Sequence, residues 1–456
     1  MIKKNAGVLL PISALPGNHG IGDFSDFAYQ FVDWLKERHY HYWQILPLNP
    51  LGPGDSPYIT ICSEAIDIRF ICLTDLVDMG LLKSVPDFQK SSTSINYGDV
   101  LAFKEKYLRK AFGKSTYDLA RFKANNPWAV KYGEYLVLKK INDNRVWNEW
   151  DICEIPEEMK NEVDYHIWCQ YIAYKQWNKL VNYCHANGIK LIADCPFYVG
   201  LDSVDCYMHQ DQFMLDENHR PTLVSGCPPD AFSDDGQLWG TPIYNFEKMK
   251  EDNYSFLINR IGFLSRHCDY LRLDHFRAFD TYCVIPAEDK NARRGEWKVG
   301  PRHDFFDSLY ARYPGIQIIA EDLGLLFDSV HTLRDDYNLP GMKVIQFCIF
   351  DVYNIKENVI LYPGTHDNQT LYGWLKSLNK IDKDTLKEMF HHPKDLYAAL
   401  FDYIWNMKSI ITIIPLQDLL KLDDKARINH PGTVGKPNWC FKLKDMTWVN
   451  NVKFGN

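Results

Sequence analysis

The sequence lacks long apolar runs. No stretch of roughly 18 or more apolar residues occurs, and a helix needs about that many to cross a bilayer. The lysine pair Lys3-Lys4 gives a basic start, but Pro11 and Pro16 interrupt the apolar residues that follow too early for a secretion signal. We therefore expect neither a spanning helix nor a signal peptide.

Paired cysteine motifs are also missing. The twelve cysteines are scattered, and no two of them have a C-x-x-C spacing. Without such spacing a structural zinc site is not expected. Because no secretion signal precedes them, the thiols are expected to stay reduced in a cytoplasmic protein.

The balance of charge disfavours anionic partners. The net charge is −8 at neutral pH, and no basic tract stands out. Nucleic acids and anionic membranes bind clusters of lysine and arginine, so neither is an expected partner. Aromatic residues, in contrast, make up 14% of the chain. They fill cores, but they also stack on the flat apolar faces of sugar rings.

Eight apolar stretches have the length and composition of strands, and helical patterns or helix-sized insertions separate nearly all of them. Eight such units predict a (β/α)8 barrel, an α/β fold. An open doubly wound sheet is the alternative, but no glycine-rich phosphate turn follows the first strand. A full helix does not fit between Phe350 and Val359. The predicted strands are Gly7–Ser13, Tyr42–Leu48, Gly188–Asp194, Tyr270–Asp274, Gln317–Glu321, Lys343–Phe350, Val359–Thr365 and Ile410–Leu416.

We expect a single catalytic barrel over residues 1–456 with three insertions. The stretch 51–163 leaves the strand–helix rhythm but is rich in aromatic residues, which predicts a folded subdomain. The stretch 199–245 reads as a loop-rich insertion, and 280–301 as a short one. Helical patterns lie near Phe24–Leu35, Trp168–Asn187, Asn245–His267, Asp304–Tyr313, Asp328–Tyr337 and Leu396–Met407.

Carboxylates stand where several of these strands end. Asp274 closes its strand, and Arg272, two residues earlier, shares its face. Glu321 and Asp367 end two later strands, and catalytic groups of a (β/α)8 barrel gather at such ends. Each has a structural alternative: a buried Arg–Asp pair that braces a strand, or a carboxylate that caps a helix. Asp194, at the end of the third strand, is more readily a hydrogen-bonding residue near the site than a participant.

Clustered acids suit retaining glycoside chemistry. One carboxylate attacks the anomeric carbon, and a protonated one, roughly 5 to 5.5 Å away, passes its proton to the leaving oxygen. Arg272 favours an ionised Asp274, as a nucleophile requires. The negative charge of Asp274 would in turn raise the pKa of Glu321, as a general acid requires.

Several short motifs occur in a fixed order along nearly the whole chain. They are Ser56–Tyr58, Ala193–Val199, Pro228–Ser233, Gly236–Gly240, the segments around Asp274, Glu321 and Asp367, and then Arg427, Asn429, Pro431–Thr433 and Asn438–Trp439. Together they resemble the 4-α-glucanotransferases of the amylomaltase type (disproportionating enzymes, glycoside hydrolase family 77), relatives of the α-amylase clan. The resemblance implies an enzyme that moves α-1,4-glucan segments between malto-oligosaccharides without a metal or organic cofactor.

The same resemblance implies roles for individual residues. Asp274 would be the nucleophile, Glu321 the acid/base, and Asp367 the stabiliser of the transition state through the hydroxyls of the transferred sugar. The segment Pro228–Trp239 resembles a mobile loop over the acceptor side, although Trp239 could instead be a packed loop aromatic. The substrate-binding residues implied are Tyr58, which would stack on the transferred sugar, Arg272, His366, Trp239, Asp194 and Asn438.

The chain departs from the family pattern at a few positions. Ala278 stands where glycine is usual, Cys283 where tryptophan is usual, and Arg302 in place of the last glycine of a common Gly-Pro-Gly. Asp67-Ile68 replaces a common Asn-Pro. Because the carboxylates are unchanged, we expect effects on loop geometry, acceptor preference and rate rather than on the reaction class.

Two other functions fit the same motifs. An α-1,4-glucan hydrolase would share the site and differ only in how well its acceptor side excludes water. A non-catalytic glucan-binding protein would not need three acids together. The sequence leaves open the preferred glucan length, the formation of cyclic products, the oligomeric state and the pathway.

Overall fold

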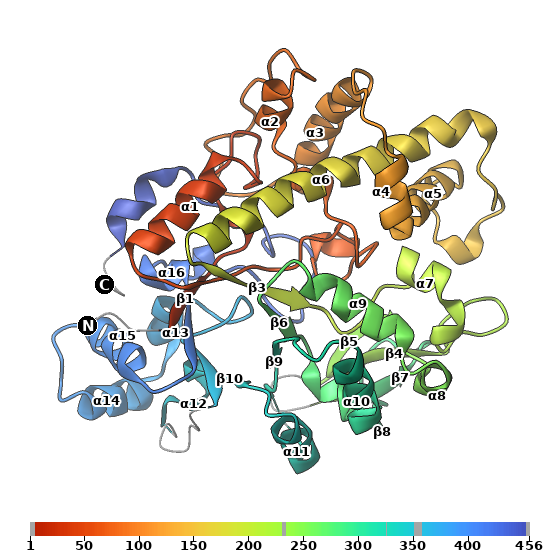
Figure 1. Ribbon diagram of the computed structural model, residues 1–456. Helices are drawn as coiled ribbons and strands as arrows, with labels where there is room; N and C mark the ends of the chain where they lie inside the picture. Colours follow the sequence, from red (N-terminus) through yellow and green to blue (C-terminus); the bar gives the residue numbers. More distant parts are fainter. Residues whose placement is uncertain (1–4, 230–233, 325, 351–357, 453–456) are drawn as a thin grey trace.

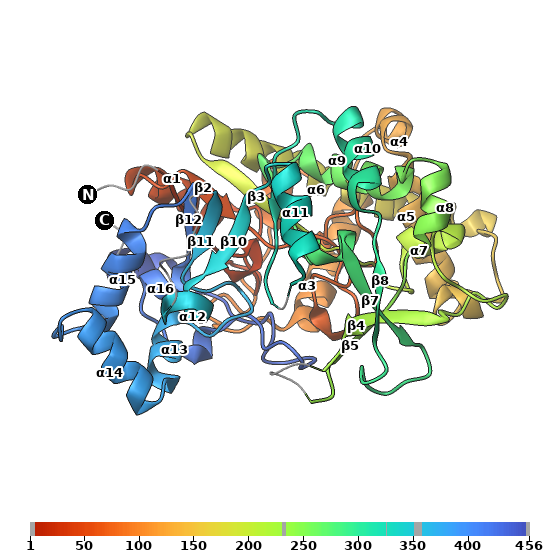
Figure 2. The same ribbon diagram turned by 90° about the horizontal axis from the view of Figure 1, so that it is seen from below.

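The computed structural model describes residues 5–229, 234–324, 326–350 and 358–452. Eight strands close into a barrel in the order β1-β12-β11-β10-β9-β6-β3-β2, and helices surround it (Figures 1 and 2). The predicted (β/α)8 barrel is confirmed. Its strands are β1 (Ala6–Leu9), β2 (Tyr42–Gln44), β3 (Lys190–Cys195), β6 (Tyr270–Leu273), β9 (Ile318–Ala320), β10 (Gly341–Val344), β11 (Val359–Tyr362) and β12 (Ile411–Pro415).

The barrel closes where β1 pairs in parallel with both β12 and β2. Strands β1 and β12 are buried along their full length, as expected for a parallel sheet covered by helices. At the seam a Cβ atom on Gly7 would lie 2.5 Å from the Cβ atom of Tyr42. Only glycine fits such a close approach.

The barrel helices follow their strands in the predicted alternation. The longest, α6, has 27 residues and ends at Ala186, just before Gly188 adopts a positive φ of 74°. The helices outside the insertions are α1 (Asp26–Glu37), α6 (Lys160–Ala186), α8 (Phe246–Glu251), α9 (Ser255–Ser265), α10 (Arg302–Arg312), α11 (Asp328–Asp336), α12 (Ile345–Cys348), α13 (Leu371–Ser377), α14 (Lys380–Met389), α15 (Leu396–Asn406) and α16 (Leu416–Leu419).

The region after β10 differs from the prediction. The expected strand Lys343–Phe350 is wrong beyond Val344, because α12 begins at Ile345. The buried side chains of Ile345 and Ile349 are four residues apart, which is the spacing of a helical face. Most of the link for which no helix was found, residues 351–357, lies outside the described residues. Helices α13 and α14 were not predicted, and their N-caps are the side chains of Thr370 and Asn379.

Two insertions together build a second sheet, which lies beside the barrel in Figure 2. The four strands are antiparallel, in the order β5-β4-β7-β8. The prediction of a loop-rich stretch at 199–245 misses two of them, β4 and β5; β5 contains glycine and proline, which are uncommon in strands. The elements are α7 (Val204–Met208), β4 (Leu223–Cys227), β5 (Gln237–Pro242), β7 (Thr281–Pro286) and β8 (Glu296–Val299).

The stretch 51–163 supplies helices that lie along α6 in Figure 1. A buried ion pair anchors them, because Lys104 of α3 places its Nζ atom 2.6 Å from Asp23, just before α1. The same Nζ donates to the backbone carbonyls of Arg69 and Ile71. The helices are α2 (Leu73–Asp78), α3 (Tyr97–Phe112), α4 (Ala120–Asn125) and α5 (Pro127–Ile141).

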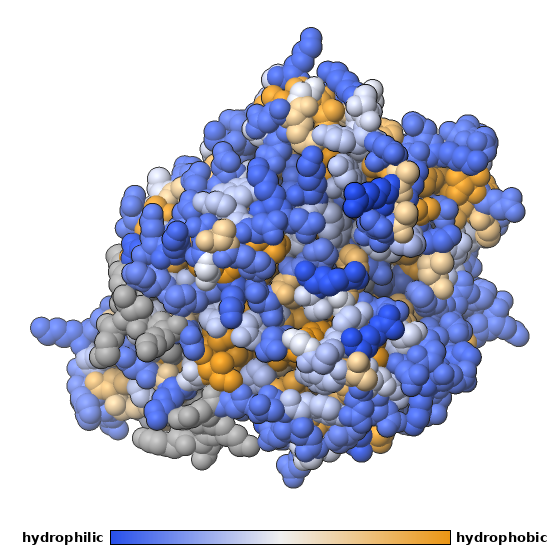
Figure 3. All heavy atoms as spheres, viewed as in Figure 1, coloured by the Kyte–Doolittle hydropathy of each residue, from blue (hydrophilic) through white to orange (hydrophobic). Residues whose placement is uncertain are grey.

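The surface and the thiols are consistent with the composition. None of the described helices is long and apolar enough to cross a membrane. The face drawn in Figure 3 is mostly hydrophilic, with small separated apolar areas. None of the twelve cysteines, all of which lie within the described residues, forms a disulfide.

The Lys104–Asp23 pair leads to a stability prediction. Lys104→Met leaves the Asp23 carboxylate buried without its cation, so the free energy of unfolding should fall by about 3–5 kcal/mol. The double variant Lys104→Met/Asp23→Asn should recover part of this lost free energy of unfolding, because it no longer buries an unpaired charge. Denaturant titrations followed by circular dichroism measure both. The control is Lys131→Met, which breaks an exposed pair with Glu134 and should change stability little. Equal effects of Lys104→Met and Lys131→Met would contradict the prediction.

Candidate active site

Two carboxylates lie side by side at the carboxyl ends of adjacent strands. Asp274 directly follows β6 and Glu321 directly follows β9. Backbone bonds continue beyond the strands: the Asp274 N–H donates to the Cys195 carbonyl at 3.0 Å, and the Glu321 N–H to the Leu273 carbonyl at 3.2 Å. The parallel register therefore fixes both acids at one edge of the barrel, as the sequence predicts.

Arg272 connects the nucleophile candidate to a second acid. Its Nη1 atom lies 2.7 Å from both carboxylate oxygens of Asp194 and 2.9 Å from Oδ1 of Asp274. The side chains of Arg272 and Asp194 are buried, whereas that of Asp274 is 28% exposed. The hydroxyl of Tyr58 donates to Asp194 at 2.6 Å. Asp194 thus holds Arg272 and Tyr58 in place. It is connected to Asp274 through the Arg272 guanidinium.

The electrostatics distinguish the two acids. Burial raises the pKa of the Glu321 carboxyl to about 8; Arg272 opposes this shift and Asp274 reinforces it. Burial also raises the pKa of the Asp274 carboxyl, against the hydrogen bond and charge of Arg272. The backbone N–H of His275 donates to Glu321 at 2.8 Å. Because only Asp274 of the two accepts a hydrogen bond from the guanidinium, Glu321 is the more easily protonated acid.

Asp367 enters the site from the loop after β11 and is held by the C-terminal part of the chain. The side-chain amide of Asn429 donates to its Oδ1 at 2.6 Å, and Arg427 donates to its backbone carbonyl at 2.7 Å. The Nε2 atom of His366 lies 3.4 Å from Oδ2. Sequence reasoning noted Arg427 and Asn429 as matching residues without a task, and the structure gives them one.

An aromatic wall stands next to the carboxylates. The rings of Tyr58 and His366 are stacked with centroids 5.2 Å apart. Trp439 packs against both, at 5.6 Å from Tyr58 and 6.0 Å from His366. Burial lowers the pKa of His366, so its ring is neutral at pH 7. Trp439 was not predicted as a site residue, although its neighbour Asn438 was.

Asn438 lies behind this wall. It is 1% exposed, and its side chain bonds the backbone N–H of His430 and both the carbonyl and the hydroxyl of Thr433. These contacts fold the turn that carries Trp439.

Trp239 of β5 makes another aromatic contact, next to Asp274. Its ring meets that of His275, the residue after Asp274, at 4.9 Å and at right angles. The second sheet thus reaches the site through Trp239. Asp230, Ala231, Phe232 and Ser233 of the expected covering loop lie outside the described residues.

The departures from the family pattern have local explanations. Arg302 has a φ of 47°, a region that favours glycine, and pairs at 2.8 Å with the buried Asp280. Ala278 is buried beside the nucleophile strand, and Cys283 packs in a small apolar cluster of the second sheet. Asp67 caps a short helical turn through the N–H of Arg69.

Among the described residues no group of three or more metal-ligating side chains occurs.

Comparison with known proteins identifies the family. A family model described as 4-alpha-glucanotransferase matches residues 10–447. The 4-alpha-glucanotransferases of Streptococcus pneumoniae and Clostridium butyricum are 36% and 35% identical to the chain, over 98% and 97% of its length and 94% and 96% of theirs.

A solved structure agrees with this match. The structure of the amylomaltase from Streptococcus agalactiae in complex with acarbose superposes with a TM-score of 0.92 at 31% identity, covering 99% of this chain and 98% of that one. The amylomaltase from Corynebacterium glutamicum, at 17% identity and a TM-score of 0.78 over 99% of this chain and 73% of that one, shares the fold. With nearly its whole length matched, the chain belongs to the 4-alpha-glucanotransferase family.

Proposed function

We propose that this glucanotransferase takes an α-1,4-glucan segment from one malto-oligosaccharide and passes it to the 4-hydroxyl of another by a retaining double displacement. The observation that carries the proposal is the pair Asp274 and Glu321 at adjacent strand ends, where only Asp274 bonds a guanidinium. A carboxylate beside a protonated carboxyl is the arrangement that this reaction needs.

Asp274 is the nucleophile of the proposed reaction. Its Oδ atom attacks the anomeric carbon as the glycosidic bond breaks, and a covalent glycosyl-enzyme forms. The Arg272 bond opposes the rise in the pKa of this carboxyl that burial causes, and so favours its ionised form; Asp194 fixes the guanidinium from its other side.

Glu321 is the acid/base. In the first step its proton goes to the leaving oxygen of the shortened glucan. In the second step the carboxylate takes the proton of the acceptor 4-hydroxyl as that oxygen attacks the anomeric carbon and displaces Asp274. Its raised pKa supplies the protonated form that the first step requires.

The surrounding residues bind the glucan. Asp367 bonds hydroxyls of the transferred sugar as the ring flattens toward the transition state, and His366 lies beside it. Tyr58 stacks on that sugar, and Trp239 contacts the glucan on the acceptor side. We assign Asn438 to the support of the Trp439 turn, because its polar atoms bond that turn.

Transfer is favoured over hydrolysis and over mere binding. The relatives found bear the name of a transferase, and three clustered acids exceed what a binder requires. Trp239, which packs over His275 beside the nucleophile, is suited to exclude water from the glycosyl-enzyme. We further propose that residues 1–456 form one catalytic unit with insertions and that the protein is cytoplasmic, in keeping with its free thiols.

Maltotriose tests the reaction. The purified protein should convert it into a ladder of longer maltodextrins with glucose or maltose, separated by chromatography. Asp274→Asn should lose nearly all turnover, at least about 10⁴-fold, because the nucleophile is gone, yet should still bind maltotriose in calorimetry. Glucose and maltose without longer products would instead indicate a hydrolase. Full activity of Asp274→Asn would remove the nucleophile assignment.

The dependence of kcat/KM on pH tests Glu321. The donor step needs its protonated form, so kcat/KM should fall as pH rises through its pKa, near 8. Asp274 must be ionised, so kcat/KM should also fall at low pH. This fall should occur at a higher pH than the usual pKa of an aspartate, because burial raises the pKa of Asp274. Glu321→Gln should abolish the alkaline limb along with most of the activity. An unchanged alkaline limb in that variant would contradict the assignment.

A further inference from the structure

Trp439 is held in an unfavourable backbone conformation at the edge of the site. Its φ is 63°, which is uncommon for a residue with a bulky side chain. Its N–H donates to the Ile428 carbonyl at 2.6 Å. Such a conformation persists only where surrounding contacts impose it. Contacts to the backbone and the ring of Trp439 must therefore hold it in this conformation.

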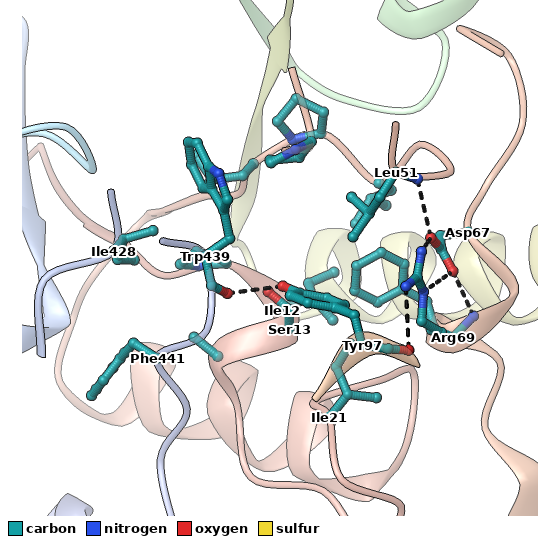
Figure 4. Close-up of a pocket in the computed structure, with 17 residues that line it drawn as sticks. Ile12, Ser13, Ile21, Leu51, Asp67, Arg69, Tyr97, Ile428, Trp439 and Phe441 are labelled. Carbon is teal, nitrogen blue, oxygen red and sulfur yellow. Dashed lines mark hydrogen bonds and ion pairs between the residues drawn. The ribbon is translucent and has the colours of Figure 1, made fainter. Parts of the chain in front are cut away.

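The ring of Trp439 is buried in an apolar cluster with Tyr97 and Ile428. One side of it contacts Tyr58 and His366, and the residue also borders a cavity, shown in Figure 4, that is lined in part by Leu51, Pro57 and Tyr97. A cavity leaves part of a side chain without close contacts. A polar contact to the Trp439 backbone adds to this packing.

A chain of polar contacts crosses the wall of that cavity (Figure 4). The hydroxyl of Tyr97 donates to the Trp439 carbonyl at 2.8 Å. Arg69 donates to the Tyr97 carbonyl at 3.4 Å, and its guanidinium lies over the Tyr97 ring at 5.2 Å. Asp67 binds that guanidinium at 2.8 and 2.5 Å and accepts from the backbone N–H of Leu51 at 3.4 Å.

These contacts link two separate parts of the aromatic wall. Leu51 begins the loop that carries Tyr58, and Trp439 sits on the C-terminal turn. Asp67, Arg69 and Tyr97 are all buried, so each hydrogen bond is costly to lose.

We infer that Tyr97, supported by the Asp67–Arg69 ion pair, is a positioning residue that holds Trp439 against Tyr58 and so shapes the subsite for the transferred sugar. This inference rests on the proposed function, because it concerns the sugar that Tyr58 is proposed to stack on. Tyr97 acts through the Trp439 carbonyl and does not touch the glucan.

Tyr97→Phe removes the hydroxyl and keeps the ring. It should raise the KM for maltotriose about fivefold, the effect of one lost hydrogen bond, while kcat stays within about twofold. The control is Tyr174→Phe, which removes a hydroxyl bonded to the Glu64 carbonyl away from the wall and should leave KM unchanged. If Tyr97→Phe lowers only the melting temperature, the positioning role is wrong.

A double-mutant cycle tests the route through Trp439. In a Trp439→Ala background the indole that Tyr97 is inferred to position is already absent, so Tyr97→Phe should have no further effect on KM. The same fivefold increase in that background would overturn the inference.

The double variant Arg69→Met/Asp67→Asn should have a higher free energy of unfolding than Asp67→Asn alone. The single variant leaves the buried guanidinium without a carboxylate.

One readout does not depend on activity. The indole N–H signal of Trp439 in a ¹H–¹⁵N spectrum, assigned by its loss in Trp439→Phe, should shift in Tyr97→Phe and not in Tyr174→Phe. An unmoved signal would contradict the inference even if the enzyme is active. If the wild-type protein fails to make maltodextrins longer than maltotriose, the proposed function is wrong. The indole N–H signal of Trp439 still decides the role of Tyr97 in that case.

Discussion

The guanidinium of Arg272 lies between two carboxylates, Asp194 at 2.7 Å and Asp274 at 2.9 Å, on adjacent strands of the barrel. A buried cation of this kind is stable only with both partners, and each partner is costly to bury without it. The guanidinium therefore favours the ionised state of Asp274 over that of Glu321, which lacks such a hydrogen bond and is the more easily protonated of the two. Asp194 also receives the Tyr58 hydroxyl, so the aromatic wall and the acids share one anchor.

The barrel strands and the segments inserted between them supply different parts of the proposed site. The strand ends supply the acids, and the parallel register places them within reach of one anomeric carbon. The long segment after β2 supplies Tyr58, the second sheet supplies Trp239, and the C-terminal turn supplies Trp439. Asn429 and Arg427 join that C-terminal segment to Asp367. The proposed glucan-binding surface is thus assembled from segments distant in sequence around the acids that the barrel strands carry.

Local patterns predict the barrel and its acids, because buried runs such as Ile318–Ala320 end in a carboxylate. The second sheet could not be predicted, since β5 contains glycine and proline and most of β8 is exposed. Trp439 was missed for a different reason. Its backbone is held by Tyr97, 342 residues away in the chain, and no pattern in the sequence signals such a contact. The predicted strand at Lys343–Phe350 failed because the short helix α12 is as rich in apolar residues as a strand, although Phe347 is exposed.

The most direct test of the double displacement is to trap the covalent intermediate on Asp274. Glu321→Gln incubated with α-maltosyl fluoride should accumulate a glycosyl-enzyme, because fluoride leaves without an acid and the second step lacks its base. Peptic digestion and mass spectrometry should then find one maltosyl group on the peptide that contains Asp274. An adduct on Asp194 or Asp367, or no adduct while the fluoride is still turned over, would contradict the account.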